Sequence, residues 1–345
     1  MNTKIDKRTV ALRAMRCEPV PYTPWSFGFT YEAAEKLKAH YGTDNLDQIF
    51  DNHIQYLNVF GGFENIGNDC YKDFFGVVWD RSEDKDIGVV KNLLIPEPTL
   101  AGFKLPPVPG QAAFDAAVGK PIEQQTDLLR MFAIGFSLFE RAWTLRGMEN
   151  LLMEMCVNPE FVEELLTTIT DFNIEVVKRA LEYDIDAVHF GDDWGQQHGL
   201  IMGPVMWKKF IYPQLKRIYG VVKDAGKMVS IHSCGDVDEL FDDLIGIGLN
   251  NFNPFQPEVM DTFALMEQYK GRLSFWGGLS TQRTLPYGTV DQVVAESKKL
   301  LEKGLDGGYI FAPAHGVEGD VPLENMLAFI NTAQQQKGYT QHSLL

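Results

Sequence analysis

The C-terminal half of the sequence alternates between short apolar runs and longer segments with helical periodicity. The apolar runs lie at 187–190, 228–231, 249–252, 273–276 and 309–312. The helical patterns between and after them cover 204–223, 236–247, 260–269, 289–303 and 323–334. Because parallel strands need a long crossover connection, most often a helix, this order predicts a parallel sheet built from β/α units.

The N-terminal half is less regular. Residues 9–15 predict a helix, 22–29 a strand or an extended entry into the fold, and 128–146 a strand followed by a helix. The stretch 87–125 holds six prolines and predicts an irregular insertion. No repeat or linker divides the 345 residues. We therefore expect an α/β fold with one domain over 1–345, a (β/α)₈ TIM-like barrel with N-terminal extensions and this insertion. A doubly wound parallel sheet is the competing architecture.

The charge and the apolar content exclude several classes of partner. The net charge of −16 would repel nucleic acid and anionic membrane surfaces at long range. No apolar run approaches the roughly 20 residues that cross a bilayer, and the N-terminus lacks the apolar core of a secretory signal. The four cysteines have no regular spacing, which does not suggest a disulfide framework. These features predict a cytoplasmic protein with reduced thiols that acts on a small molecule.

Polar residues follow each of the five predicted strands. The strand ends are Gly191-Asp192-Asp193-Trp194, His232-Ser233-Cys234-Gly235, Asn253-Pro254-Phe255-Gln256, Gly277-Gly278 and Pro313-Ala314-His315-Gly316. In a barrel the carboxyl ends of parallel strands form one rim, where active sites lie. The same residues have ordinary structural interpretations one by one, since Asp192 or Asp193 can cap a helix and the glycines can form a turn. Their accumulation on one rim indicates a catalytic site.

Three of these rim residues suit a transition metal. His232 and Cys234 are two residues apart at a strand end, so their side chains point the same way, and His315 follows the last strand. One thiolate and two imidazoles leave a fourth position open, which is typical of a catalytic Zn²⁺ site. Asp192 or Asp193 would complete the ligand set or orient a ligand. Among the other histidines, His189 is expected in the packed core, and His198 is a weak alternative ligand.

The order of these motifs resembles the uroporphyrinogen decarboxylase superfamily, and within it the cobalamin-dependent methyltransferase branch. The matching segments are 8–24, 191–212, 223–243, 253–258, 275–286 and 307–325, of which 191–258 is the most specific block. The resemblance implies a single TIM-like barrel. It also implies a zinc ion that activates a methyl acceptor thiol or a methylated heteroatom, and a corrinoid (cobalamin) carried by a separate partner protein.

At two places the sequence differs from the patterns of this superfamily, and these differences bear on which of its activities the chain has. The decarboxylase clamps a polycarboxylate with arginines after its first strand, but residues 25–31 here contain none, and unpaired buried carboxylates would be costly. The methyltransferases that use coenzyme M have a second cysteine at the position of His315. Replacing that thiolate with an imidazole makes the zinc a stronger Lewis acid, which favours polarising an ether oxygen over activating a thiol.

We therefore expect an O-demethylating methyltransferase that passes a methyl group from a methoxylated, aromatic small molecule to the corrinoid. Aromatic side chains expected to line the site are Trp25, Phe29, Trp194 and Trp276, and polar substrate contacts are expected from Gln197, Asn253 and Gln256. Three alternatives stay open at this point: a methylcobamide:thiol methyltransferase, a decarboxylase or lyase on another acid with Asp192 or Asp193 handling the proton, and a non-catalytic accessory protein. A homodimer is a further candidate assembly.

Overall fold

A parallel sheet forms the centre of the protein. The computed structural model describes residues 5–125 and 127–340. Seven strands pair in the order β1-β6-β7-β10-β11-β12-β13, and every pair is parallel. Their bounds are β1 Ile54–Leu57, β6 Leu129–Ile134, β7 Ala187–Gly191, β10 Met228–His232, β11 Asn251–Phe255, β12 Ser274–Leu279 and β13 Tyr309–Pro313.

An extended segment around Trp25 closes this sheet into a barrel. On one side it pairs with β13, because the Phe311 N–H donates to the Pro24 carbonyl at 2.8 Å and the Ser26 N–H to the Phe311 carbonyl at 3.2 Å. On the other side the His53 N–H, next to β1, donates to the Trp25 carbonyl at 3.0 Å. The segment therefore occupies the eighth strand position, and a closed barrel replaces the open edges that a doubly wound sheet would leave. The expected (β/α)₈ fold is confirmed.

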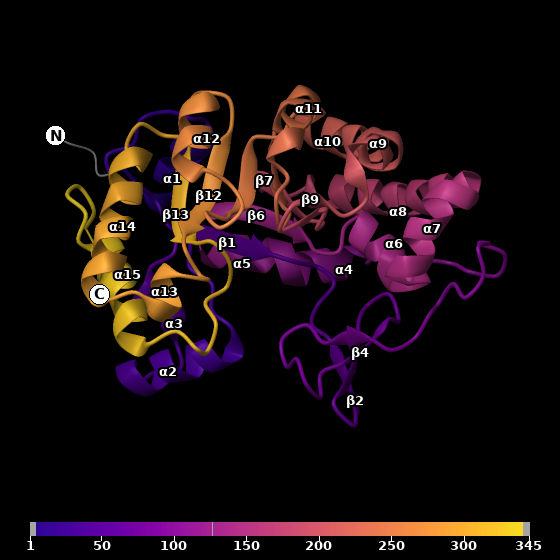
Figure 1. Cartoon of the computed structure of the whole chain (residues 1–345), viewed down its shortest axis with the longest axis horizontal. Helices are drawn as coiled ribbons and strands as arrows, with labels where there is room; N and C mark the ends of the chain where they lie inside the picture. Colours follow the sequence, from indigo (N-terminus) through magenta and orange to yellow (C-terminus); the bar gives the residue numbers. More distant parts are fainter. Residues whose placement is uncertain (1–4, 126, 341–345) are drawn as a thin grey trace.

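Helices cover the outside of the barrel (Figure 1). They are α1 Lys7–Met15, α2 Tyr31–Tyr41, α3 Leu46–Phe50, α4 Gln111–Phe114, α5 Lys120–Gln124, α6 Phe139–Arg146, α7 Met148–Val157, α8 Pro159–Ala180, α9 Gly203–Met206, α10 Tyr212–Asp224, α11 Phe241–Ile247, α12 Thr262–Gln268, α13 Thr284–Tyr287, α14 Val290–Gly304 and α15 Leu323–Gln334. A π-helical turn, Trp207–Ile211, joins α9 to α10. Local capping signals fix some starts: Thr289 and Gln292 form a capping box at α14. None of the described helices is long and apolar enough to cross a membrane.

The predicted and observed elements agree closely in the C-terminal half, with one instructive shift. The helix expected at 323–334 is α15 itself, whereas the strand expected at 249–252 is observed two residues later, as β11. Pro254 interrupts the apolar pattern, and proline is disfavoured inside sheets because it has no N–H to donate. The sheet accommodates it through a register irregularity between Phe252 and Phe255.

The long connection from β1 to β6 contains a small sheet that the sequence interpretation missed. Strands β2 Glu64–Gly67, β3 Cys70–Lys72, β4 Val78–Asp80 and β5 Val89–Val90 form an antiparallel meander. Figure 1 shows it as an arm below α4 and α6. These strands are only two to four residues long, and β2 is exposed along its whole length, so they carry almost no apolar alternation to detect. Within the predicted insertion, residues 91–110 are irregular, whereas 111–124 are helical.

A buried ion pair attaches this connection to the helical layer. Arg146 at the end of α6 donates to both carboxylate oxygens of Glu154 in α7, and its third nitrogen donates to the Pro96 carbonyl at 2.9 Å. The Arg146 and Glu154 side chains are 6% and 3% exposed.

We expect Arg146→Met to lower the free energy of unfolding by about 3–5 kcal/mol, because it leaves a buried carboxylate unpaired. Urea denaturation measures this. The matched control is Lys178→Met, whose pair with Glu175 is exposed and should cost less than about 1 kcal/mol; equal losses in the two variants would contradict the assignment.

Candidate active site

His232, Cys234 and His315 converge at the carboxyl end of the barrel. His232 is the last residue of β10, Cys234 follows two residues later, and His315 follows β13. One ligand atom from each of the three lies within 4.8 Å of the other two. The Cys234 Sγ is 3.4 Å from the His232 Nε2, and the two imidazole rings are 5.8 Å apart. Borderline nitrogen and sulfur donors at this spacing fit one Zn²⁺ with a position left for substrate.

Asn253 of β11 orients His232. The Asn253 Nδ2 donates to the Trp276 carbonyl at 3.0 Å, which identifies the amide oxygen as the atom that faces His232. That oxygen therefore accepts from the His232 Nδ1–H at 2.7 Å. With its proton on Nδ1, His232 presents the lone pair of Nε2 toward Cys234 and His315, as a metal ligand must. Asn253 also lines the pocket described below, so its expected contact with substrate stays a prediction, in addition to this hydrogen bond with His232.

Carboxyl groups surround the thiol. The Asp193 carboxylate accepts from the Cys234 backbone N–H at 2.8 Å and lies 3.8 Å from the His232 Nε2. Burial and the negative charge of Asp193 raise the pKa of the Cys234 thiol far above its usual value. Burial, with the charges of Asp193 and Asp192, also raises the pKa of the Glu140 carboxyl well above its usual value. A cation at this place would relieve both effects, because it stabilises the thiolate and the carboxylates together.

His315 is the most exposed of the three. Partial loss of water around its ring lowers the pKa of His315, and the neighbouring His232 adds to this effect. The imidazole is therefore neutral near pH 7, which is the form that binds metals.

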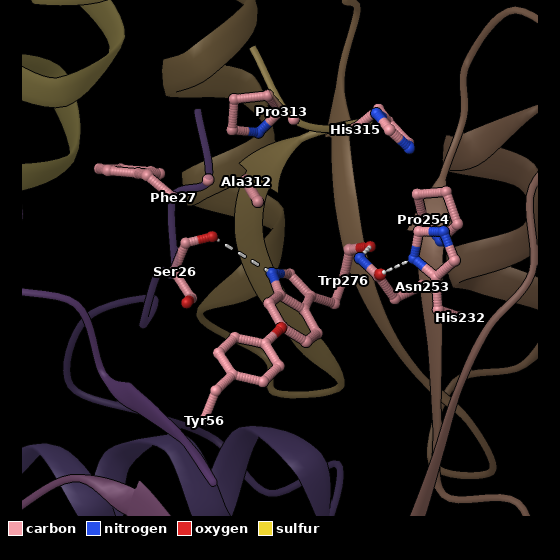
Figure 2. Close-up of a pocket in the computed structure, with 12 residues that line it drawn as sticks. Ser26, Phe27, Tyr56, His232, Asn253, Pro254, Trp276, Ala312, Pro313 and His315 are labelled. Carbon is pink, nitrogen blue, oxygen red and sulfur yellow. Dashed lines mark hydrogen bonds between the residues drawn. The ribbon is translucent and has the colours of Figure 1, made fainter. Parts of the chain in front are cut away.

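A pocket of about 240 Å³ opens next to these residues (Figure 2). Its walls come from the inner faces of several strands, with Ser26, Tyr56, His232, Asn253, Trp276 and His315 among the lining residues. The Tyr56 and Trp276 rings stack with centroids 5.8 Å apart. The lining includes no lysine, arginine, aspartate or glutamate among the described residues. The pocket therefore suits a flat, uncharged ligand.

Asp192 and Trp194 lie behind this pocket. The Asp192 carboxylate accepts three backbone N–H groups at the start of α6, from Leu138, Phe139 and Glu140, and the indole N–H of Trp194. Both residues are fully buried. Burial raises the pKa of Asp192 to about 6 against the effect of these hydrogen bonds. Asp192 therefore anchors the start of α6. Trp194 was expected to line the site, but it is not among the residues that line the pocket.

The remaining predicted contacts fall outside the pocket. Trp25 is fully buried, donates to the Phe50 carbonyl and packs against Tyr339. Phe29 stacks on Phe50 and Phe329. Gln197 lies in the exposed turn between β8 Gly195–Gln196 and β9 Gly199–Leu200. The side-chain oxygen of Gln256 accepts a hydrogen bond from the Gly235 N–H. For Trp25 the reason is strand parity: neighbouring residues face opposite sides, and Ser26 is the one that faces the pocket.

The sequence interpretation missed Tyr56, Ser26 and Glu140. Tyr56 lies in β1, Glu140 follows β6, and Ser26 lies in the extended segment that pairs with β13, all in the N-terminal half, where the sequence pattern is least regular. The predicted region 128–146 was not divided into its strand and its helix. Had the strand been ended at Ile134, Glu140, which lies six residues beyond β6, would have been placed at the rim.

Comparisons with known proteins identify the family. A family model described as uroporphyrinogen decarboxylase (URO-D) matches residues 132–336. The methylcobamide:CoM methyltransferase MtaA of Methanosarcina barkeri is 24% identical over 171 residues, which cover 50% of this chain and 48% of that protein. A uroporphyrinogen decarboxylase of Danio rerio is 26% identical over 176 residues, which cover 50% of this chain and 46% of that protein. The chain thus spans about half the length of the curated relatives it matches.

A solved structure extends the likeness over the whole fold. A methyltransferase from Methanosarcina mazei superposes on 96% of this chain and 99% of its own with a TM-score of 0.70, at 18% sequence identity. At this identity the likeness concerns the fold. Because relatives with two different activities match at similar identity, the choice between those activities must come from the site.

Proposed function

The chain belongs to the uroporphyrinogen decarboxylase family, and within it we propose a zinc-dependent methyltransferase that moves a methyl group from a methoxylated small molecule to the cobalt of a corrinoid carried by a partner protein. The observation that carries this proposal is the convergence of His232, Cys234 and His315 beside an uncharged aromatic pocket. Zinc bound by these three side chains would act as a Lewis acid on the ether oxygen of the substrate.

The lining of the pocket argues against anionic substrates. A uroporphyrinogen carries several carboxylates and coenzyme M carries a sulfonate, and both need cationic partners when they leave water. No lysine or arginine is among the described lining residues. The buried Arg141 and Arg146 are already paired with Asp73 and Glu154. A neutral aryl methyl ether needs no such partner.

The residues of the chain position the reactants. The stacked Tyr56 and Trp276 offer a flat apolar wall for an aromatic ring, and Asn253 holds His232 in the tautomer that binds metal. In the proposed reaction the methyl–oxygen bond would break with its electron pair left on oxygen, and the corrinoid of the partner protein would supply the electron pair for the new bond to carbon. The oxyanion takes a proton from solvent, which reaches the site because Tyr56 is 50% exposed.

A second candidate is a methylcobamide:thiol methyltransferase, which the matched relative from Methanosarcina barkeri favours. In that case the same zinc site would activate a thiol, and the methyl group would leave cobalt instead of reaching it. The acceptor would be a thiol without a negatively charged group, because the described lining offers it no cation.

A series of aryl methyl ethers tests the proposed direction. We expect the rate of methyl transfer to rise as the leaving phenol becomes more acidic, because negative charge accumulates on the departing oxygen in the transition state. Rates measured by the spectral conversion of cob(I)alamin to methylcob(III)alamin, at matched ring size, give the dependence. Rates that stay constant or fall with phenol acidity would mean that cleavage of this bond is not the chemical step.

A further inference from the structure

A chain of buried hydrogen bonds crosses the barrel one layer below the metal-ligand residues. Asn251 of β11 donates from Nδ2 to the carbonyl and hydroxyl oxygens of Ser274, at 3.3 and 3.2 Å. Its Oδ1 accepts from the Ser230 hydroxyl at 2.8 Å, and the Ser230 oxygen lies 2.9 Å from Nδ1 of His189. The side chains of Ser230, Asn251 and Ser274 are fully buried, and His189 is 8% exposed.

This chain of bonds fixes the tautomer of His189. The bond to the Ser274 carbonyl requires the amide nitrogen of Asn251 at that end, so the amide oxygen faces Ser230. The single hydroxyl proton of Ser230 is then used on Asn251. His189 must therefore carry its proton on Nδ1 and donate it to Ser230, which leaves a lone pair on Nε2. No described residue makes a hydrogen bond to that Nε2.

The His189 ring lies directly behind three side chains that line the pocket, although it is not itself one of the lining residues. Its centroid is 5.9 Å from Tyr56, 5.7 Å from Trp276 and 6.4 Å from His232, and all three residues line the pocket. Because Ser230 pairs with His189 and precedes His232 by two residues on β10, His189 lies on the inner face, one layer deeper than the metal ligands. The Nε2 is not among the fully enclosed polar atoms that lack a partner, so it keeps contact with the open space beside the ring and can accept a hydrogen bond from a ligand there.

We infer that His189 is a specificity-determining residue, and that its Nε2 accepts a hydrogen bond from a phenolic hydroxyl of the substrate. The preferred methyl donors are then methoxyphenols, which carry both an ether for the metal and a hydroxyl for His189. Fully methylated analogues have no donor for Nε2 and leave it unpaired. The inference rests on the proposed function for the identity of the methoxy group, but the hydrogen bond itself is measurable without any methyl transfer.

Calorimetric binding in the absence of corrinoid tests it on the full chain with zinc. The ligands are 2-methoxyphenol and 1,2-dimethoxybenzene, which differ only in the hydroxyl proton and one methyl group. We expect the wild type to prefer 2-methoxyphenol by about ten-fold or more. His189→Phe keeps a ring but removes the acceptor, so its two dissociation constants should become similar. Ser230→Ala frees the tautomer and should reduce the preference in a chain with an intact His189.

The matched control is His198→Phe, an exposed histidine in the turn between β8 and β9, which should keep the full preference. Equal binding of the two ligands by the wild type, or an unchanged preference in His189→Phe, would overturn the inference. A preference that depends on His189 in a protein that transfers no methyl group from any ether would support this inference and reject the proposed function.

Discussion

Replacing Cys234 with alanine is expected to reduce bound zinc from about one ion per chain to less than about a tenth of that, and methyl transfer with it. Cys234 is the only thiol among the three converging ligands, and its Sγ lies 3.4 Å from the His232 Nε2. Its removal leaves two neutral imidazoles, which bind zinc far more weakly than a set with a thiolate. Elemental analysis of the purified variant, at equal protein concentration, measures the loss.

The control for this variant is Cys156→Ala, because Cys156 is an exposed free thiol of α7. It should keep the wild-type zinc content and activity. Full occupancy in Cys234→Ala, or no zinc in the wild-type protein, would refute the metal site.

The His315→Ala variant should lose methyl transfer by about a thousand-fold or more, while its unfolding temperature stays within about 2 °C of the wild type. The ring stands at the rim, and its role in the proposed site is to bind the metal. Removing it should cost little packing because the side chain is exposed, whereas the proposed metal site would lose one of its three protein ligands. Steady-state rates and a thermal scan of the same preparation separate the two effects.

A second substitution at this position makes the result specific. His315→Cys restores a ligand of a different kind and should keep zinc bound, whereas His315→Ala should not. If His315→Ala retained most of the wild-type rate, His315 would be a loop residue and not a ligand.

The three candidate metal ligands could be found from the sequence, because simple sequence patterns determine where these residues lie. His232 and Cys234 share a side of the chain through the two-residue period of a strand, and His315 follows a strand that neighbours the barrel closure. The helical patterns of the C-terminal half are equally clear, since amphipathic helices cover the outside of the barrel. His315 is therefore easy to find although it is more than 80 positions from His232 and Cys234 in the sequence, with ligand atoms of the three within 4.8 Å of one another.

The pocket around them was harder to predict, for physical reasons that differ by residue. Trp25 and Ser26 are neighbours on one strand, and only the register with β13 decides which of them faces inward. Gln256 resembled a substrate contact, but its carbonyl oxygen caps the Gly235 N–H. Tyr56 comes from β1, whose four residues are too few to show a period. Position within the barrel, not residue type, separates the residues that line the pocket from the purely structural ones.

Two assays on the zinc-loaded protein test the central claim most directly. One offers cob(I)alamin with methoxylated aromatics, and the other offers methylcob(III)alamin with a small uncharged thiol. The account predicts that methylcob(III)alamin forms in the first assay, with release of the free phenol, and that Cys234→Ala and His315→Ala abolish it. Turnover in the second assay alone would contradict the demethylation while retaining the zinc site, and turnover in neither would contradict the assignment as a methyltransferase.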